Sequence, residues 1–321
     1  MKIENYREAF LNYMGKNISV KEPENLYQPI DYIMSLGGKR MRPVLVLMSC
    51  DLFGGDFYEA MEAALSVEMF HNFTLIHDDI MDSADLRRGK QTVHNKWDLN
   101  TGILSGDALM ILSNQRLEYY EGSTFKNLSS LFNKTALEVC EGQQLDIDFE
   151  SKLTVALDTY IKMISFKTAV LVGASMKMGA IVANASSEDQ NELYDFGLNL
   201  GIAFQLQDDF LDTFGSEDFG KRIGGDILES KKTFLYIKSL ELANQEDKAK
   251  LLELYSGVHE EVEKISKVKA IFIKYGVDDL LQDAIQRYTM KALKDIDSLS
   301  LDETKKSVLK NFGMDLMKRK T

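Results

Sequence analysis

Residues 57–84 read FYEAMEAALSVEMFHNFTLIHDDIMDSA, and this run decides the fold class. It contains neither proline nor glycine, and its apolar residues do not alternate as they would in a half-buried strand. A run of this length without a breaking residue predicts one long α-helix, which carries the acidic cluster DDIMD at 78–82 near its carboxyl end. Because helical residues four apart share a face, Asp78 and Asp82 would point the same way.

The same acidic pattern returns 130 positions later (208 − 78), as DDFLD at 208–212 near the end of a helix predicted over 188–213. One such motif could equally be a solvated helix face. Two copies, each embedded in apolar residues, favour metal sites, because clustered carboxylates repel one another until a cation neutralises them. Carboxylate oxygens are hard ligands of the kind that Mg²⁺ prefers.

The small number of prolines indicates that the rest of the chain is also helical. The 321-residue chain has only three, Pro23, Pro29 and Pro43, so residues 44–321 form a proline-free stretch. An interior proline costs a helix roughly 3 kcal/mol, so long helices need such stretches. With 45% hydrophobic residues available for a core, we predict an all-α protein. We expect one domain over 1–321, a large antiparallel helical bundle in which the two acidic helices face a central cavity.

The other predicted helices cover residues 1–20, 28–36, 43–53, 101–121, 125–148 and 153–183, with more amphipathic helices over 227–320. Loops are predicted at 22–27, 86–95 and 215–225, where polar residues or glycines interrupt the helical pattern.

Charge and cysteine content limit the possible partners and compartment. The net charge of −12 weighs against nucleic acid as a binding partner, because a negatively charged chain repels it. Cys50 and Cys140 have neither metal-type spacing nor a disulfide framework, which fits a cytoplasmic protein. The amino terminus lacks a signal-peptide pattern, and we expect no transmembrane segment.

Basic residues gather at the predicted helix breaks and beside the acidic motifs: Lys39, Arg40, Arg42, Arg87, Arg88, Lys167, Lys221, Arg222, Lys231 and Lys232. Any one of them alone is best explained as a solvated surface charge. Their position favours a polyanion held jointly with Mg²⁺, and diphosphate fits. His71, two turns before Asp78, is either a core residue or a donor to a second phosphate. Glu68-x-x-His71 matches half of a di-iron pattern, but no second Glu-x-x-His exists.

Taken in order, these motifs resemble the trans-isoprenyl diphosphate synthases (polyprenyl synthetases) of the short-chain type. The matching segments are GGKRMRP at 37–43, LIHDDIMD at 75–82, DLRRG at 85–89, KT at 167–168, QLQDDFLD at 205–212, GK at 220–221 and GDI at 225–227. They cover most of the chain, and no catalytic element is missing. The resemblance implies an isoprenoid-synthase bundle, usually homodimeric, that joins isopentenyl diphosphate to an allylic diphosphate.

The resemblance also implies a role for each matching residue. About three Mg²⁺ ions would be bridged by Asp78, Asp82 and Asp208, with support from Asp79, Asp209 and Asp212. The allylic diphosphate would be held by Arg87, Lys167 and Lys221. Isopentenyl diphosphate would be held by Lys39, Arg42, His71 and Arg88. The side-chain oxygens of Thr168 and Gln205 would stabilise the allylic cation.

Phe73 and Thr74 are predicted to set the product length. Phe73 lies five residues before Asp78, about 7.5 Å further down the helix. In the family that the chain resembles, a bulky residue there stops elongation early, and the two-residue insertion typical of bacterial farnesyl enzymes is absent. We expect a C20 product, with C15 next. If Phe73 is only a core residue, Phe70 or Met69 would form the floor of the cavity that holds the growing product. Longer products remain an alternative.

Two other classes of protein remain as alternatives. A terpene cyclase shares the first motif and the helical bundle, but it usually has a different second metal motif and needs no pocket such as Lys39 and Arg42 for a second diphosphate. A non-catalytic subunit of a heteromeric prenyl synthase typically loses carboxylates, whereas both clusters here are complete.

Overall fold

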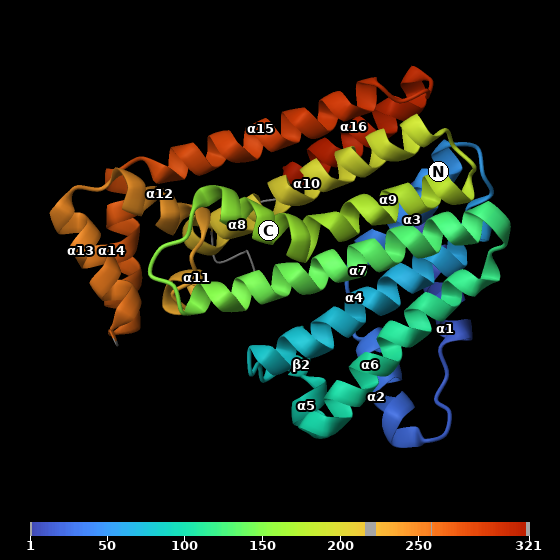
Figure 1. The fold of residues 1–321 in the computed structure, drawn as a ribbon, viewed down its shortest axis with the longest axis horizontal. Helices are drawn as coiled ribbons and strands as arrows, with labels where there is room; N and C mark the ends of the chain where they lie inside the picture. The colour runs from blue at the N-terminus through green and yellow to red at the C-terminus, as the bar shows by residue number, and fades with distance from the viewer. Residues whose placement is uncertain (1, 216–222, 258, 319–321) are drawn as a thin grey trace. The chain divides into compact units, whose positions relative to one another are not determined.

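The structure is a computed structural model that describes residues 2–215, 223–257 and 259–318 (Figure 1). The all-α prediction is confirmed: the described residues form helices apart from connecting turns and one ribbon of two antiparallel two-residue strands, β1 (Leu86–Arg87) and β2 (Lys90–Gln91). The helices up to residue 150 are α1 (Ile3–Asn17), α2 (Glu24–Ser35), α3 (Met41–Leu52), η1 (Phe57–Ala60), α4 (Met61–Met81), α5 (Val93–Lys96), α6 (Leu99–Gln115), η2 (Arg116–Tyr119) and α7 (Gly122–Glu150). Those that follow are α8 (Leu157–Ile164), η3 (Ser165–Ala169), α9 (Val170–Val182), α10 (Ser187–Phe214), α11 (Gly225–Leu228), α12 (Phe234–Leu242), α13 (Gln245–Ser256), α14 (Glu261–Lys274), α15 (Val277–Asp297) and α16 (Glu303–Met317).

The chain forms two compact units. Unit 1 comprises Met1–Ala136 and Ala174–Tyr194, and unit 2 comprises Leu137–Gly173 and Asp195–Thr321. Helices α7, α9 and α10 contribute residues to both units. The first acidic motif therefore belongs to unit 1 and the second to unit 2, and each is described in its own unit. The assignment of residues 1–321 to a single domain stays a prediction.

Helix α4 is the centre of unit 1. It packs against α3 and α6, and Figure 1 shows it running beside α6. Its residues Leu65, Val67, Met69 and Phe70 are almost completely buried. A helix that is apolar on nearly every face is stable only when other helices surround it. This packing fixes the direction of the acidic motif at its carboxyl end.

The core of unit 2 is formed by α8 and α12–α15. Leu235, Tyr236, Val268 and Leu281 are fully buried there. The sequence predicted helices over 227–320 without a role for them. In the structure they build the support on which the segment after the second acidic motif rests, because α11 packs against α14.

Three predicted boundaries need correction. Residues 22–27 were expected to be a loop, but α2 begins at Glu24, directly after Pro23, and an acidic first turn suits the positive end of the helix dipole. The loop expected at 86–95 contains the β1–β2 ribbon and α5. The helix expected over 153–183 is interrupted by a π-helical turn, η3.

One helical stretch bears on the expectation of no transmembrane segment, which stays a prediction. The stretch Leu157–Val182 is long and apolar enough to cross a membrane by length and composition, with a mean hydropathy of 1.2. However, 67% of its most apolar window is buried inside the protein. A helix in the protein core is buried to this degree. Because buried positions favour apolar residues, the apolar composition of this stretch is that of a core helix.

Candidate active site

Helix α4 ends in the first acidic motif, and Arg87 is bound to it. The Arg87 Nε donates to both carboxylate oxygens of Asp79 at 2.8 Å, and its Nη2 lies 3.5 Å from Asp78 Oδ2. Asp79 is buried, which raises the pKa of its carboxyl group, while Arg87 opposes that rise. The side chain of Asp78 is 24% exposed, and Asp82 is exposed where it caps the helix. Asp78 and Asp82 therefore remain accessible to a ligand from solvent.

Arginines surround His71, seven residues before Asp78. The Arg42 Nη1 lies 3.2 Å from His71 Nε2. Since a guanidinium can only donate, Nε2 accepts and the imidazole proton lies on Nδ1. Burial, and then the charges of Arg42, Arg88 and Arg87, hold the pKa of His71 well below its usual value, so the ring is neutral. This corner of unit 1 concentrates positive charge without any carboxylate of the acidic motif in direct contact with Arg42.

The predicted chain-length residues lie further along α4. Phe73 is 7% exposed, and its ring packs against those of Phe70 and His77 at centroid distances of 5.5 and 4.8 Å. The half-buried Thr74 donates its hydroxyl to His71 O at 2.8 Å. A Cβ at Gly106 would lie 2.3 Å from His77 Nε2, so glycine at this position lets α6 lie against this ring without displacing it.

In unit 2, a pocket of about 120 Å³ brings together three of the four residues predicted to be catalytic, Lys167, Thr168 and Gln205. The fourth, Lys221, lies outside the described residues, as does Arg222. The complete lining is Asp146, Phe149, Tyr160, Met163, Ile164, Lys167, Thr168, Gln205, Asp209, Asp226, Lys231, Lys232 and Thr233.

The π-helical turn η3 presents Lys167 and Thr168 to this pocket. This turn could not be predicted, since the sequence pattern reads as one continuous helix. A π turn inserts one extra residue and so changes the direction of the side chains it carries. Gly142 of α7 makes room, because a Cβ there would lie only 2.2 Å from the Lys167 backbone nitrogen. The Lys167 Nζ then pairs with Asp146 Oδ2 at 2.6 Å, and the Thr168 hydroxyl lies 3.4 Å from Gln205 Oε1.

Asp209 of the second motif is buried against this pocket. It accepts hydrogen bonds from the Tyr160 hydroxyl and from Gln205 Nε2. Its pKa is raised well above the usual value, first by burial and then by the neighbouring carboxylate of Asp226. Asp212 is tied to the same neighbour, because the Asp226 backbone N–H donates to Asp212 Oδ2 at 3.0 Å.

Several lining residues had received no individual role from the sequence. Asp226 and Lys231 form an ion pair at 3.6 Å, and the carboxylates of Asp226 and Glu229 raise the pKa of Lys231 although burial lowers it. Their signal was present, since Asp226 belongs to a matching motif and Lys231 to the basic residues at helix breaks. Tyr160 and Asp146 carried no such signal.

The donor chemistry of both motifs fits Mg²⁺. Among the residues that the structure describes, no three His, Cys, Asp or Glu side chains converge as a metal site. However, the ligands offered are carboxylate oxygens, and the pKa of Asp209 is raised partly because Asp226 and Asp208 crowd negative charge around it. A divalent cation would relieve that repulsion.

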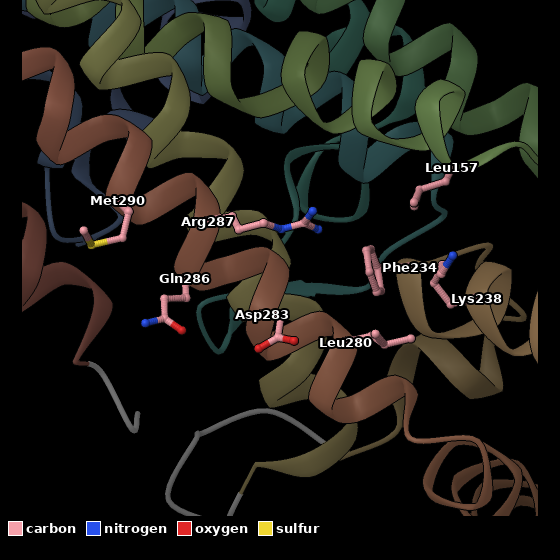
Figure 2. Close-up of a pocket in the computed structure, with 8 residues that line it drawn as sticks. All are labelled: Leu157, Phe234, Lys238, Leu280, Asp283, Gln286, Arg287 and Met290. Atoms are coloured by element: carbon pink, nitrogen blue, oxygen red, sulfur yellow. The ribbon is translucent and has the colours of Figure 1, made fainter.

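A larger groove of about 700 Å³ lies elsewhere on unit 2 (Figure 2). Figure 2 shows Asp283, Gln286, Arg287 and Met290 projecting from α15, with Phe234 and Leu157 across the groove. It contains no predicted site residue and no motif carboxylate. The smaller pocket beside Asp209 is therefore the candidate catalytic pocket of this unit.

Comparison with known proteins agrees with this arrangement. A model of the polyprenyl synthetase family matches residues 23–272. A geranylgeranyl diphosphate synthase of Saccharolobus solfataricus is 36% identical over 97% of this chain and 95% of its own. A crystal structure of a geranylgeranyl pyrophosphate synthase superposes with a TM-score of 0.95 at 48% identity, covering 100% of both chains. A geranylgeranyl pyrophosphate synthetase from Pyrococcus horikoshii Ot3 gives a TM-score of 0.92 at 33% identity, covering 99% of this chain and 97% of that one.

The family match covers far more than half of the chain and includes both acidic motifs, the glycine-arginine segment at 37–43 and the Lys167–Thr168 turn. With the fold, the motifs and the relatives in agreement, the chain belongs to the polyprenyl synthetase family.

Proposed function

We propose that this protein joins isopentenyl diphosphate to an allylic diphosphate, head to tail and with Mg²⁺, to give a short-chain prenyl diphosphate. Geranylgeranyl diphosphate (C20) is the expected main product, with farnesyl diphosphate (C15) next. The names of its relatives support this proposal. The observation that carries it is that unit 1 offers two different anion sites, the motif carboxylates with Arg87 and the arginines around His71.

Two such sites suit two different diphosphates. Carboxylates attract a diphosphate only together with a metal, whereas an arginine cluster can bind one directly. A condensing enzyme needs both, but a terpene cyclase binds a single diphosphate. The same sites argue against a non-catalytic subunit, for which intact carboxylates would have no use.

Mg²⁺, about three ions by the family resemblance, is the metal that the two motifs would hold. Asp78 and Asp82 on α4 and Asp208 on α10 are the proposed direct ligands. Asp79, Asp209 and Asp212 would support them through the contacts with Arg87, Tyr160 and the Asp226 backbone. When bound, the metal supplies positive charge that offsets the charge developing on the departing diphosphate.

The protein's own cations would share that task. Arg87 and Lys167 are already held in place by Asp79 and Asp146, so little conformational entropy remains to be lost when an allylic diphosphate binds them. Lys221 is proposed as a third cation of this set. Lys39, Arg42, His71 and Arg88 are the proposed site for isopentenyl diphosphate, in which neutral His71 would orient Arg42 through their contact.

Thr168 and Gln205 are proposed to stabilise the allylic cation. Their oxygens lie 3.4 Å apart in a pocket to whose lining Phe149, Met163 and Ile164 contribute apolar side chains. Oxygen dipoles act strongly where water is excluded. Exclusion of water also protects the cation from being quenched before the double bond of isopentenyl diphosphate attacks it and a proton is lost.

The proposal is tested by incubating the protein with Mg²⁺, labelled isopentenyl diphosphate and dimethylallyl, geranyl or farnesyl diphosphate. The products are dephosphorylated and sized by chromatography, with an EDTA control. We expect a linear C20 alcohol that disappears with EDTA. A longer product would still support this class of reaction. The residue that limits product length would then lie further along α4 than Phe73. No condensation with any primer would contradict the proposal.

A homodimer is the expected assembly. Helix α6 exposes a row of apolar side chains at helical spacing: Leu99, Ile103, Leu104, Met110 and Ile111. Leu104 and Ile111 are 59% and 63% exposed. An apolar row of this kind on a stable helix marks a surface that another protein covers, and we propose that a second copy of this chain covers it.

We therefore expect Leu104→Glu with Ile111→Glu to convert the dimer into a monomer, because two carboxylates would be buried without partners. Light scattering after gel filtration should show the mass falling to the 36.4 kDa of one chain. Leu242→Glu, at a 48% exposed leucine on α12, is the control and should stay dimeric. A monomeric unsubstituted protein, or an unchanged mass in the double variant, would contradict this assembly.

The cytoplasmic location and the absence of a nucleic-acid partner stay predictions. The first rests on the two cysteines, which form no disulfide framework, and the second on the net charge of −12.

A further inference from the structure

Arg40 lies in the middle of the proposed isopentenyl diphosphate segment, yet it faces the core. From the sequence, Arg40 was one of the basic residues expected near a diphosphate, without an individual role. In the structure its side chain is only 2% exposed, while Lys39 beside it is exposed and Arg42 is half-buried. Arg40 also has a positive φ of 51°, which a residue with a side chain adopts only when its surroundings hold it there.

The surroundings of Arg40 are a buried ion pair and two carbonyl groups. Its Nη1 donates to the carboxylate of Glu68 on α4, whose side chain is 3% exposed. Its Nη2 donates to Met34 O at 2.5 Å and to Leu36 O at 3.3 Å, near the end of α2. One guanidinium therefore joins α4 to the segment that leads into Lys39 and Arg42.

Asn72 fixes the acidic partner. The Asn72 Nδ2 donates to Glu68 Oε1 at 3.1 Å and to Glu68 O at 2.8 Å, one helical turn away. Because Arg40 and Asn72 both donate to Glu68 Oε1, the Glu68 carboxylate is held in one position. A charge pair this deep in a protein is strongly destabilised when one partner is removed, so its geometry is enforced.

Arg88 also binds the segment that leads into Lys39 and Arg42. Its Nη1 donates to Leu36 O at 2.7 Å and also to Gly37 O. Leu36 O thus accepts from both Arg40 and Arg88. The backbone allows this approach because residue 38 is glycine: a Cβ there would lie 2.7 Å from Arg88 Nη1.

We propose that the buried Arg40–Glu68–Asn72 network is a positioning device that presets residues 36–42, so that Lys39 and Arg42 meet isopentenyl diphosphate in the correct arrangement. This inference rests on the proposed function of those two residues. Arg40 itself is turned into the core and acts through them. The segment is ordered before the ligand arrives, and less entropy is lost on binding.

The network predicts a selective kinetic effect. Glu68→Gln and Arg40→Lys should raise the KM for isopentenyl diphosphate about ten-fold or more, because each weakens the hold on Leu36 O and the neighbouring carbonyl groups. The KM for the allylic diphosphate should change by less than about two-fold, since Asp78 and Arg87 make no contact with the network. Glu62→Gln, on the same helix but paired with Tyr13 and Arg116, is the matched control.

A double variant separates positioning from folding. Apolar residues of similar volume often replace a buried ion pair without loss of stability. Arg40→Met with Glu68→Met should therefore keep a thermal unfolding midpoint close to that of the unsubstituted protein while still raising the KM for isopentenyl diphosphate. Equal increases in both KM values, or a stable double variant with unchanged kinetics, would overturn the inference. Inactivity of the unsubstituted protein would contradict the proposed function instead, so the two failures are distinguishable.

Discussion

Replacing Asp78 by asparagine is expected to lower kcat about 1,000-fold, the largest loss of rate for any substitution considered in this protein. Asp78 is, together with Asp82, an accessible carboxylate of the first motif and a proposed ligand of Mg²⁺. Asparagine keeps the shape of the side chain but removes the charge that attracts a divalent cation. The loss should appear in kcat at saturating concentrations of both substrates, and raising the Mg²⁺ concentration should recover part of it.

The fold should tolerate this change, so the loss of rate can be assigned to chemistry. Arg87 binds chiefly to Asp79, with Nη2 at 2.6 Å from Asp79 Oδ1 compared with 3.5 Å from Asp78. Asp78→Asn leaves that closer pair intact. We expect an unfolding midpoint within a few degrees of the unsubstituted protein. Asp31→Asn, at an exposed aspartate of α2, is the control and should retain full activity. A rate for Asp78→Asn within about ten-fold of normal would contradict the proposed role.

Much of the fold could be predicted because the helices are signalled locally. The run at 57–84 became η1 and α4, and the helix expected over 188–213 is α10, which covers Ser187–Phe214. Absence of proline and the apolar pattern are properties of single segments, so sequence alone reports them. The π turn at Ser165–Ala169 could not be predicted in this way, because it depends on the close approach of Gly142 from a different helix.

In the candidate site too, some features can be predicted from local sequence and others depend on contacts that form on folding. Motif spacing was enough to propose the carboxylates and most of the cations as site residues, since chemistry restricts which residue types can serve; their roles stay predictions. The burial of individual site residues could not be predicted from the sequence. Arg40 and Arg42 are two positions apart in one basic segment, yet Arg40 pairs with Glu68 in the core and Arg42 contacts His71. Tyr160 reaches Asp209 across 49 positions of sequence, a contact that exists only after folding.

The second large effect is expected in product length. Phe73→Ala should move the main product from C20 to longer chains. Truncation of this buried ring frees roughly the space of one isoprene unit beneath the motif. The ring of Phe73 packs against those of Phe70 and His77, and on the proposed function it would block the growing chain along α4. The reaction should continue, because Asp78 and Arg87 are untouched. The product alcohols can be sized by chromatography after dephosphorylation.

Phe70 provides the comparison that identifies the floor of the cavity. It lies one turn further along α4, almost completely buried against Phe132. Phe70→Ala removes the same atoms at a comparable cost in stability, about 3–5 kcal/mol, so folding is equally demanding for both variants. If Phe73 is the floor, Phe73→Ala alone lengthens the product, and Phe70→Ala leaves it at C20. A longer product from Phe70→Ala alone would assign the floor to Phe70.

The opposite change should shorten the product. Thr74 is half-buried one turn below Asp78, so Thr74→Phe would place a ring closer to the acidic motif than Phe73 does. We expect C15 to replace C20, because the growing chain would meet this ring one isoprene unit earlier. Longer products from Phe73→Ala together with shorter ones from Thr74→Phe would establish α4 as the wall along which the chain grows. An unchanged product from both variants would place the growing chain against another element.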